Sequence, residues 1–197
     1  MKVYNFSGKD KDTCRIKCLE DLDLYYNEII TTEYEDDNLY KMDVLKKSEI
    51  KDYILSFLTK IFDKMNITAK IDIDEIDEIF TVKISSKDNA IIIGKDGKNL
   101  SSLQFLLKQS LRVKTKFNLK INIDVSNYRL RRQQLFEDDV KKIINDVLTT
   151  KTDTTLDPMN SYQRRIVHNV ANNYYNIETV SVGEEPNRCV VIKYIEN

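Results

Sequence analysis

Proline, glycine and tryptophan are scarce in this chain, which has two prolines, four glycines and no tryptophan among 197 residues. This scarcity of proline and glycine excludes a long flexible linker or a low-complexity tract. The domains of the chain should therefore be joined by helices or short turns. No segment approaches the ~20 apolar residues that a membrane span needs, and the N-terminus has no apolar signal-peptide core. We therefore expect a globular, cytoplasmic protein with no membrane span.

Cysteine and histidine are also few, with three cysteines and one histidine. Cys14 and Cys18 are four residues apart, which suits one face of a helix, and Cys189 lies far along the chain. An odd count without a Cys-x-x-Cys pair argues against a disulfide framework or a zinc site. A lone histidine, His168, cannot form a histidine-based metal cluster, and no serine or cysteine motif offers it a triad partner. We predict buried thiols, no metal, no cofactor and no catalytic residue.

Charge is balanced overall but unevenly distributed. The net charge of −1 by itself says nothing about nucleic acid. Within residues 20–43 the charged residues are acidic except for Lys41, whereas within residues 91–132 bases dominate and only Asp96 and Asp124 oppose them. A local basic surface attracts phosphates even on a near-neutral protein, although a solvated basic helix face would give the same composition.

Residues 1–47 predict a small acidic α+β unit. Thr13–Ile30 could form a helix with Ile16, Leu19, Leu22 and Tyr26 on one side, and Glu33–Leu45 could hold one or two short strands.

Residues 48–126 alternate between helical and strand periodicity. Ser48 is a candidate N-cap for a helix with apolar residues at helical spacing. Two alternating runs follow, Ala69–Ile73 and Phe80–Ile84, joined by a polar turn over 74–78. A short helix over 89–93, a second helix and a third strand complete the pattern; the inward positions are Leu100, Leu103, Leu107, Leu111, Leu119, Ile121, Ile123 and Val125. The order predicts an α+β domain with helices on one face of a three-stranded sheet.

Residues 127–197 predict a second compact α+β unit. A long charged helix should run over 127–148 and a second helix over 160–173, with Asn160 and Gln163 in a capping-box pattern. Residues 177–182 and 189–195 are candidate strands around a turn at 183–187. We therefore predict three parts: 1–47, 48–126 and 127–197.

The sharpest local motif is Ile91-Ile92-Ile93-Gly94-Lys95-Asp96-Gly97-Lys98. Two glycines three apart would let a nucleic-acid backbone approach the main chain, which a Cβ would block. The amides that begin the next helix, with Lys95 and Lys98, favour phosphate there. The spacing is too short for a Walker loop, and only half of a dinucleotide fingerprint is present. A plain helix–turn–helix corner is the non-functional alternative.

A second motif is Arg164-Arg165-Ile166-Val167-His168. Arg164 and His168 are four apart and so share one face of a helix, whose buried side is marked by Met159, Tyr162, Ile166 and Val170. The pair could seat a phosphate. A histidine that simply packs or caps is the alternative.

Four further stretches complete a longer pattern. They are 99–106 (Asn-Leu-Ser-Ser-Leu-Gln-Phe-Leu), Asp124-Val125-Ser126-Asn127-Tyr128-Arg129 with Arg131-Arg132, Asp157-Pro158-Met159-Asn160 with Tyr162, and Ser181–Pro186 with Arg188–Ile192. With the two motifs, residues 48–195 resemble the SpoIIIJ-associated family of bacterial proteins, also called Jag, KhpB or EloR. Its members carry a Jag domain, a KH domain and a domain named for arginine and histidine separated by three residues. Two departures stand out: residues 1–47 lack the glycine-rich Jag signature and form a divergent version of it, and Asp96 replaces a base or neutral residue.

The resemblance implies single-stranded RNA binding without catalysis, in post-transcriptional control of cell elongation and division. It also implies a small single-KH-domain partner or self-association through the KH domain. A carboxylate near a phosphate costs affinity, so Asp96 should weaken binding. The predicted RNA-binding residues are Ile93, Gly94, Lys95, Asp96, Gly97, Lys98, Arg129, Arg131, Arg132, Arg164, Arg165, His168 and Arg188.

The alternative is a protein-interaction scaffold, with the acidic N-terminal unit docking a basic partner or masking the KH surface. A nuclease built from scattered carboxylates is a more distant alternative, since no carboxylate pair or nucleophile–base pair is evident.

Overall fold

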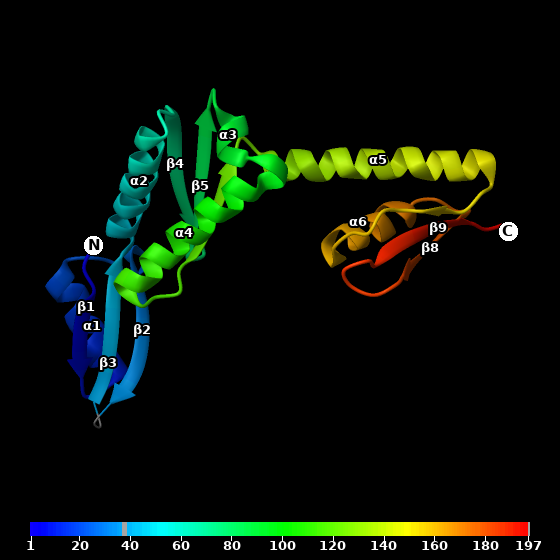
Figure 1. Ribbon diagram of the computed structural model, residues 1–197. Helices are drawn as coiled ribbons and strands as arrows, with labels where there is room; N and C mark the ends of the chain where they lie inside the picture. The colour runs from blue at the N-terminus through cyan, green and yellow to red at the C-terminus, as the bar shows by residue number, and fades with distance from the viewer. Residues whose placement is uncertain (37–38, 197) are drawn as a thin grey trace. The chain divides into compact units, whose positions relative to one another are not determined.

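The computed structural model describes residues 1–36 and 39–196, and the chain divides into two compact units, Met1–Ser126 and Asn127–Asn197. The first unit combines helices with two three-stranded sheets, and the second combines helices with one (Figure 1). The predicted parts 1–47 and 48–126 therefore lie within one compact unit. No helix in the described ranges is long and apolar enough to cross a membrane.

The first unit opens with β1 (Tyr4–Gly8), α1 (Lys11–Leu22), a 3₁₀ turn η1 (Tyr26–Glu28), β2 (Ile29–Asp36) and β3 (Leu39–Lys46). The strands form an antiparallel sheet in the order β1-β3-β2. The predicted helix and the predicted strands within 33–45 are both present in outline, as α1, β2 and β3. Residues 37–38 of that predicted range lie outside the described residues. The strand β1 was not predicted. The sheet and α1 enclose a core of Cys14, Cys18, Ile29, Met42 and Val44.

The predicted helix over Thr13–Ile30 is too long. Asp10 caps α1 by accepting a 2.7 Å bond from the amide of Thr13, and the helix ends at Asp23, whose left-handed backbone (φ 51°) stops it. The predicted buried side is right in part: Leu19 and Leu22 pack against the core, whereas Ile16 is 58% exposed and the fully buried residues of the helix are Cys14 and Cys18. Two of the three predicted buried thiols are confirmed; Cys189 is half-buried.

The remainder of the first unit is α2 (Lys47–Lys64), β4 (Ala69–Ile76), β5 (Ile79–Ser86), α3 (Asn89–Ile93), η2 (Lys95–Gly97), α4 (Lys98–Thr115) and β6 (Lys120–Val125). The sheet order is β4-β5-β6, as predicted in outline. Apolar residues from the strands and helices form its core; they include Ile54, Leu58, Phe80, Val82, Ile84, Leu107, Leu111, Ile121 and Ile123.

Two local predictions in this region are wrong. Ser48 is not an N-cap: β3 runs to Lys46 and α2 begins at Lys47 with no side-chain cap, so strand and helix join with no spare residue. The predicted turn over 74–78 shrinks to Asp77 and Glu78, because β4 continues to Ile76. Both turn residues have positive φ (50° and 61°), as a tight hairpin turn requires.

β5 pairs with β4 antiparallel and with β6 parallel. Parallel neighbours need a crossover that carries the chain from one end of the sheet back to the other. Here α3, η2 and α4 form that crossover, and this is why the two-glycine loop sits between two helices packed on the sheet.

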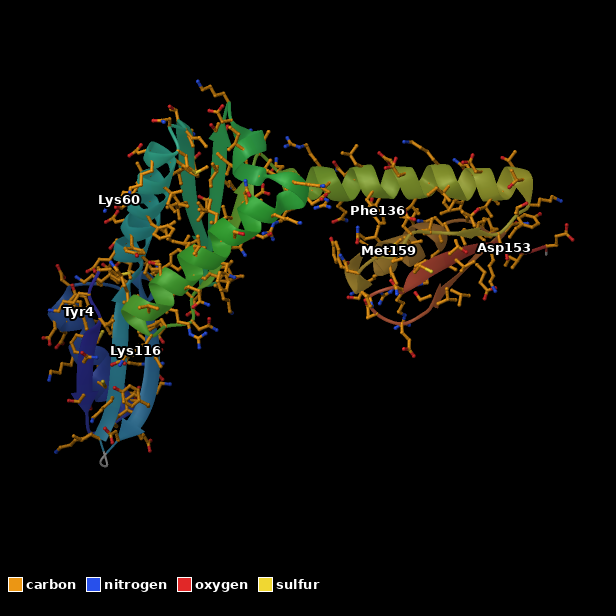
Figure 2. The ribbon with its side chains drawn as sticks, in the orientation of Figure 1. Tyr4, Lys60, Lys116, Phe136, Asp153 and Met159 are labelled. Carbon is orange, nitrogen blue, oxygen red and sulfur yellow. The ribbon has the colours of Figure 1, made fainter. Side chains whose placement is uncertain are left out.

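The second unit comprises α5 (Tyr128–Thr150), β7 (Thr154–Thr155), α6 (Ser161–Ala171), β8 (Ile177–Val182) and β9 (Cys189–Tyr194), with sheet order β7-β9-β8. Its core joins both helices to β9 through Val140, Ile144, Val147, Val167, Val170, Val190 and Ile192, with Phe136 and Met159 packed against it (Figure 2). The cap at Asn160 is confirmed, since its side chain accepts a 3.0 Å bond from the amide of Gln163. Tyr162 is not on the buried side, because it is 61% exposed.

Candidate nucleic-acid interface

The two-glycine loop reverses the chain between α3 and α4. Gly94 has φ 70° and ψ 178°, a combination open essentially to glycine alone. Asp96 (φ 56°) and Gly97 (φ 78°) are both left-handed, and the amide of Gly97 donates to the carbonyl of Gly94 at 3.2 Å. The loop is therefore a defined turn that delivers the chain into the first turn of α4, where no side-chain cap is present.

Gly94 is required by an internal contact that the sequence argument did not anticipate. The Asn99 side-chain amide donates to the carbonyl of Ile91 at 2.8 Å and so ties α4 to the end of α3. A Cβ on Gly94 would lie 2.5 Å from Cγ of Asn99. The missing side chain at Gly94 thus makes room for Asn99, whatever else approaches the loop.

The predicted loop residues differ in exposure. Lys95, Asp96 and Lys98 are exposed, whereas Ile93 and Gly97 are buried against the unit. Asp96 already has an interaction within the chain. The side chains that face solvent at this turn are consequently the two lysines and one aspartate.

The arginine–histidine pair of α6 points into the second unit. Arg164 is only 8% exposed, and its Nη1 donates to the carbonyl of Met159 and to Glu185 Oε1, both at 2.8 Å. His168 bonds both ring nitrogens to hydroxyls of β8, Nδ1 to Thr179 at 2.7 Å and Nε2 to Ser181 at 2.9 Å. The two residues share a helix face, as predicted, and fasten α6 to β8 and to the turn before β9.

The other predicted arginines are exposed. Arg165 lies on α6, next to the motif pair, and Arg188 directly precedes β9. Arg129, Arg131 and Arg132 occupy the first turns of α5; Arg132 donates to the Tyr128 hydroxyl at 3.4 Å, and Arg129 and Arg132 have further partners within the chain. The predicted site residues therefore fall into one group in the first unit and one in the second.

Sequence reasoning missed four residues that shape these groups: Asn99, Thr179, Ser181 and Glu185. Thr179 and Ser181 could have been found, because they alternate on one face of a predicted strand. Asn99 and Glu185 lay in stretches that carry the family resemblance, but nothing in the sequence assigned them a role, because their contacts to Ile91 and Arg164 follow from how the chain folds back on itself. No cluster of histidine, cysteine or acidic residues able to hold a metal ion occurs within residues 1–36 and 39–196.

Two family models match the chain in the predicted order. A KhpA/KhpB KH domain model covers residues 51–124, and a model of the domain named for its Arg-x-x-x-His motif covers residues 136–194. These ranges contain the two-glycine loop and the Arg164–His168 pair respectively.

Three curated relatives are each named RNA-binding protein KhpB. RNA-binding protein KhpB of Clostridium symbiosum is 36% identical over 149 residues, which are 75% of this chain and 67% of that protein. The KhpB of Bacillus subtilis is 26% identical over 98% of this chain and 99% of its own length. The Streptococcus pneumoniae protein is 25% identical, and the match spans 88% of this chain and 53% of that protein. The resemblance seen in the sequence is confirmed, and the chain belongs to the KhpB family.

Proposed function

We propose that this protein binds single-stranded RNA through both units and acts in the cytoplasm as a post-transcriptional regulator of cell elongation and division. The observation that carries the proposal is the loop between α3 and α4, where Lys95 and Lys98 flank a helix start without a side-chain cap. The names of the relatives, which are RNA-binding proteins, support the choice of RNA.

The loop suits a sugar–phosphate backbone for three reasons. Helix N-terminal amides and the helix dipole favour anions. Lys95 and Lys98 add exposed positive charge at the same turn. KH domains use such a loop to clamp ~four nucleotides of single strand. Asp96 opposes these charges, so we keep the expectation of weaker binding than a loop without a carboxylate would give.

In the second unit we propose that Arg165 and Arg188, which are exposed, contact phosphates. Arg164 and His168 then act as positioning residues, because Arg164 is buried against Glu185 and His168 orients two hydroxyls. The Thr179 and Ser181 hydroxyls are available to a strand of RNA in the orientation that His168 imposes.

We test the loop with the double substitution Lys95→Glu and Lys98→Glu, measuring affinity for a labelled single-stranded RNA by fluorescence polarisation. Losing two phosphate contacts should weaken binding by about tenfold or more and make the dependence of log K on log salt shallower by roughly 1.4. Substitution of Gly94 is unsuitable, since a side chain there would displace Asn99 and strain a backbone with φ 70°, so a lost affinity would not report on phosphate contact alone.

The matched control is Lys60→Glu, an exposed lysine on α2, away from the loop (Figure 2). It should change affinity little beyond the effect of net charge. Equal losses in the control and the double variant would show that the loop is not the clamp. Intact RNA after prolonged incubation with Mg²⁺ is the expected result for a protein that binds without cleaving.

We also propose a protein partner for α4. Phe105, Leu106 and Val113 are 59%, 54% and 81% exposed and fall within one arc of the helix, opposite the buried leucines. An exposed apolar stripe of this kind marks an interaction surface. A second KH domain, in another copy of this chain or in a small single-KH-domain protein, presents the matching helix.

A further inference from the structure

A groove of about 510 Å³ lies between α5 and α6 of the second unit. Its lining combines amides, an aromatic ring and apolar carbons: Gln133, Glu137, Lys141, Ile166, Asn169, Val170, Asn173 and Tyr174. The volume falls in the range of sites that hold small organic groups. The predicted RNA-binding residues are not among its lining residues.

The groove has an apolar base and polar rims. Ile166 and Val170 belong to the core of the unit and are 8% and 9% exposed, so they supply a rigid base. Tyr174 is half-buried against the same core and offers the only aromatic ring of the lining. A flat ring can rest on such a surface, since nucleobases stack on aromatic side chains.

The amides differ in how freely they can bond. Gln133 is held in place, because its Oε1 accepts from the Tyr162 hydroxyl at 2.7 Å and its Nε2 donates to Glu137 at 2.8 Å. Asn173, just beyond α6, makes long bonds of 3.3 and 3.4 Å to the main-chain carbonyls of Val170 and Asn169. The side-chain amide of Asn169 has no hydrogen-bond partner within the described residues. Asn169 therefore presents both a donor and an acceptor to the groove.

The charges at the groove disfavour a phosphate. Lys141 is paired with Asp138 at 2.9 Å, and Glu137 accepts from Gln133. A phosphate would meet an occupied lysine and a carboxylate, whereas an uncharged ring with its own donors and acceptors would meet matching amides. The chemistry thus favours a base over a backbone phosphate.

From these features we infer that the groove between α5 and α6 receives one unstacked nucleobase of the bound RNA and reads its edge through Asn169, with Asn173 beside it. The inference rests on the proposed RNA binding and adds to it a source of sequence preference. Amide side chains reading the Watson–Crick edge of a splayed base are a general mode of RNA recognition.

The test compares four short homopolymeric RNAs, of A, C, G and U, on the full-length protein by fluorescence polarisation. For the wild type we expect affinities that differ among the four. Asn169→Ala should weaken the preferred RNA by about threefold to tenfold, the effect of one or two lost hydrogen bonds, and bring the four affinities together. The salt dependence should stay unchanged, because no phosphate contact is lost.

The matched control is Asn172→Ala, an exposed asparagine on the same helix end that does not line the groove; it should behave as wild type. If the wild type binds RNA and the affinities of Asn169→Ala and Asn173→Ala are unchanged, the inference that the groove binds a base is wrong, whereas the proposed function still stands. A wild type that binds no RNA overturns the proposed function. In that case the base-binding groove is tested separately by adding uncharged nucleosides and following the side-chain amide NMR signals of Asn169 and Asn173. Shifted signals support base binding in the groove, and unmoved signals contradict it.

Discussion

Glu33 of β2 illustrates how single residues hold the N-terminal sheet together. Its carboxylate pairs with Arg15 at 2.8 Å and also with Lys11 and the Tyr40 hydroxyl. Burial by itself raises the pKa of Glu33, but the bonds from Lys11, Tyr40 and Arg15 outweigh burial and lower that pKa to about 2. Part of the acidity that marked residues 1–47 as a docking surface is therefore used inside the unit.

The stability of the first unit should fall in acid. The Glu33 carboxyl has an ordinary pKa of 4.5 when unfolded and about 2 when folded, so its contribution is complete above about pH 4.5 and is lost as the pH approaches 2. Glu33→Gln should lower the thermal midpoint near pH 6, and its deficit should shrink toward about pH 2.5. Circular dichroism melts at each pH measure this. Glu35→Gln, an exposed change on the same strand, is the control, and a deficit independent of pH would contradict the prediction.

Single residues of the two binding motifs differ in whether they can contact RNA or instead stabilise the local fold. Sequence reasoning assigned Gly94, Arg164 and His168 to RNA contact. Gly94 makes room for Asn99, Arg164 is buried against Glu185, and His168 is saturated by two hydroxyls. In both motifs, therefore, some of the residues stabilise the surface, and the residues beside them are the ones exposed to a ligand.

Among the elements, α4 serves two surfaces at once. One face packs on the sheet through Leu103, Leu107 and Leu111, and the first turn closes the two-glycine loop. The opposite face exposes Phe105, Leu106 and Val113. This exposed face is the one that we propose a second KH domain covers.

Phe105→Asp should abolish self-association if that stripe pairs with a second copy. Burying a large apolar side chain contributes ~1.5–3 kcal/mol, so its loss on both sides of a symmetric contact is decisive. Light scattering after size-exclusion chromatography at rising concentration measures the mass. Phe105→Leu keeps the surface apolar and should still associate. A wild type of monomer mass at every concentration would show that the stripe does not pair with itself.

At the scale of the whole molecule, the N-terminal sheet is built into the first unit. Leu45 is fully buried, β3 leads directly into α2, and Glu49 of α2 accepts from the Lys2 amide at 2.8 Å and the Tyr4 hydroxyl at 3.0 Å. Lys47 and Glu75 add an ion pair at 2.9 Å between α2 and β4. Residues 1–47 therefore support the fold of the KH region, whichever partner they also meet.

Truncated chains should show that residues 1–47 stabilise the first unit and that the second unit folds by itself. A fragment of residues 127–197 has its own core and should melt cooperatively by itself. Deleting residues 1–47 should lower the melting temperature of the first unit by several degrees, because it uncovers buried residues and removes the partners of Glu49. Circular dichroism melts of both fragments and the full chain provide the comparison. An unchanged midpoint after the deletion would show that the two regions fold separately.

Periodicity and motif spacing alone determined the α+β class, the order of elements from α2 to β9 apart from β7, and the family resemblance. They succeed there because burial of one face imposes a repeat of 2 or 3.6 on the sequence, and Leu100, Leu107 and Ile123 display it directly. Only the tertiary structure decided the end of α1, the strands β1 and β7, the Asn99 contact and the Arg164–Glu185 pair. The strands β1 and β7 depend on partners distant in sequence, the two side-chain contacts depend on how the chain folds back, and α1 ends where Asp23 takes up a left-handed backbone. No periodicity of the sequence records these choices.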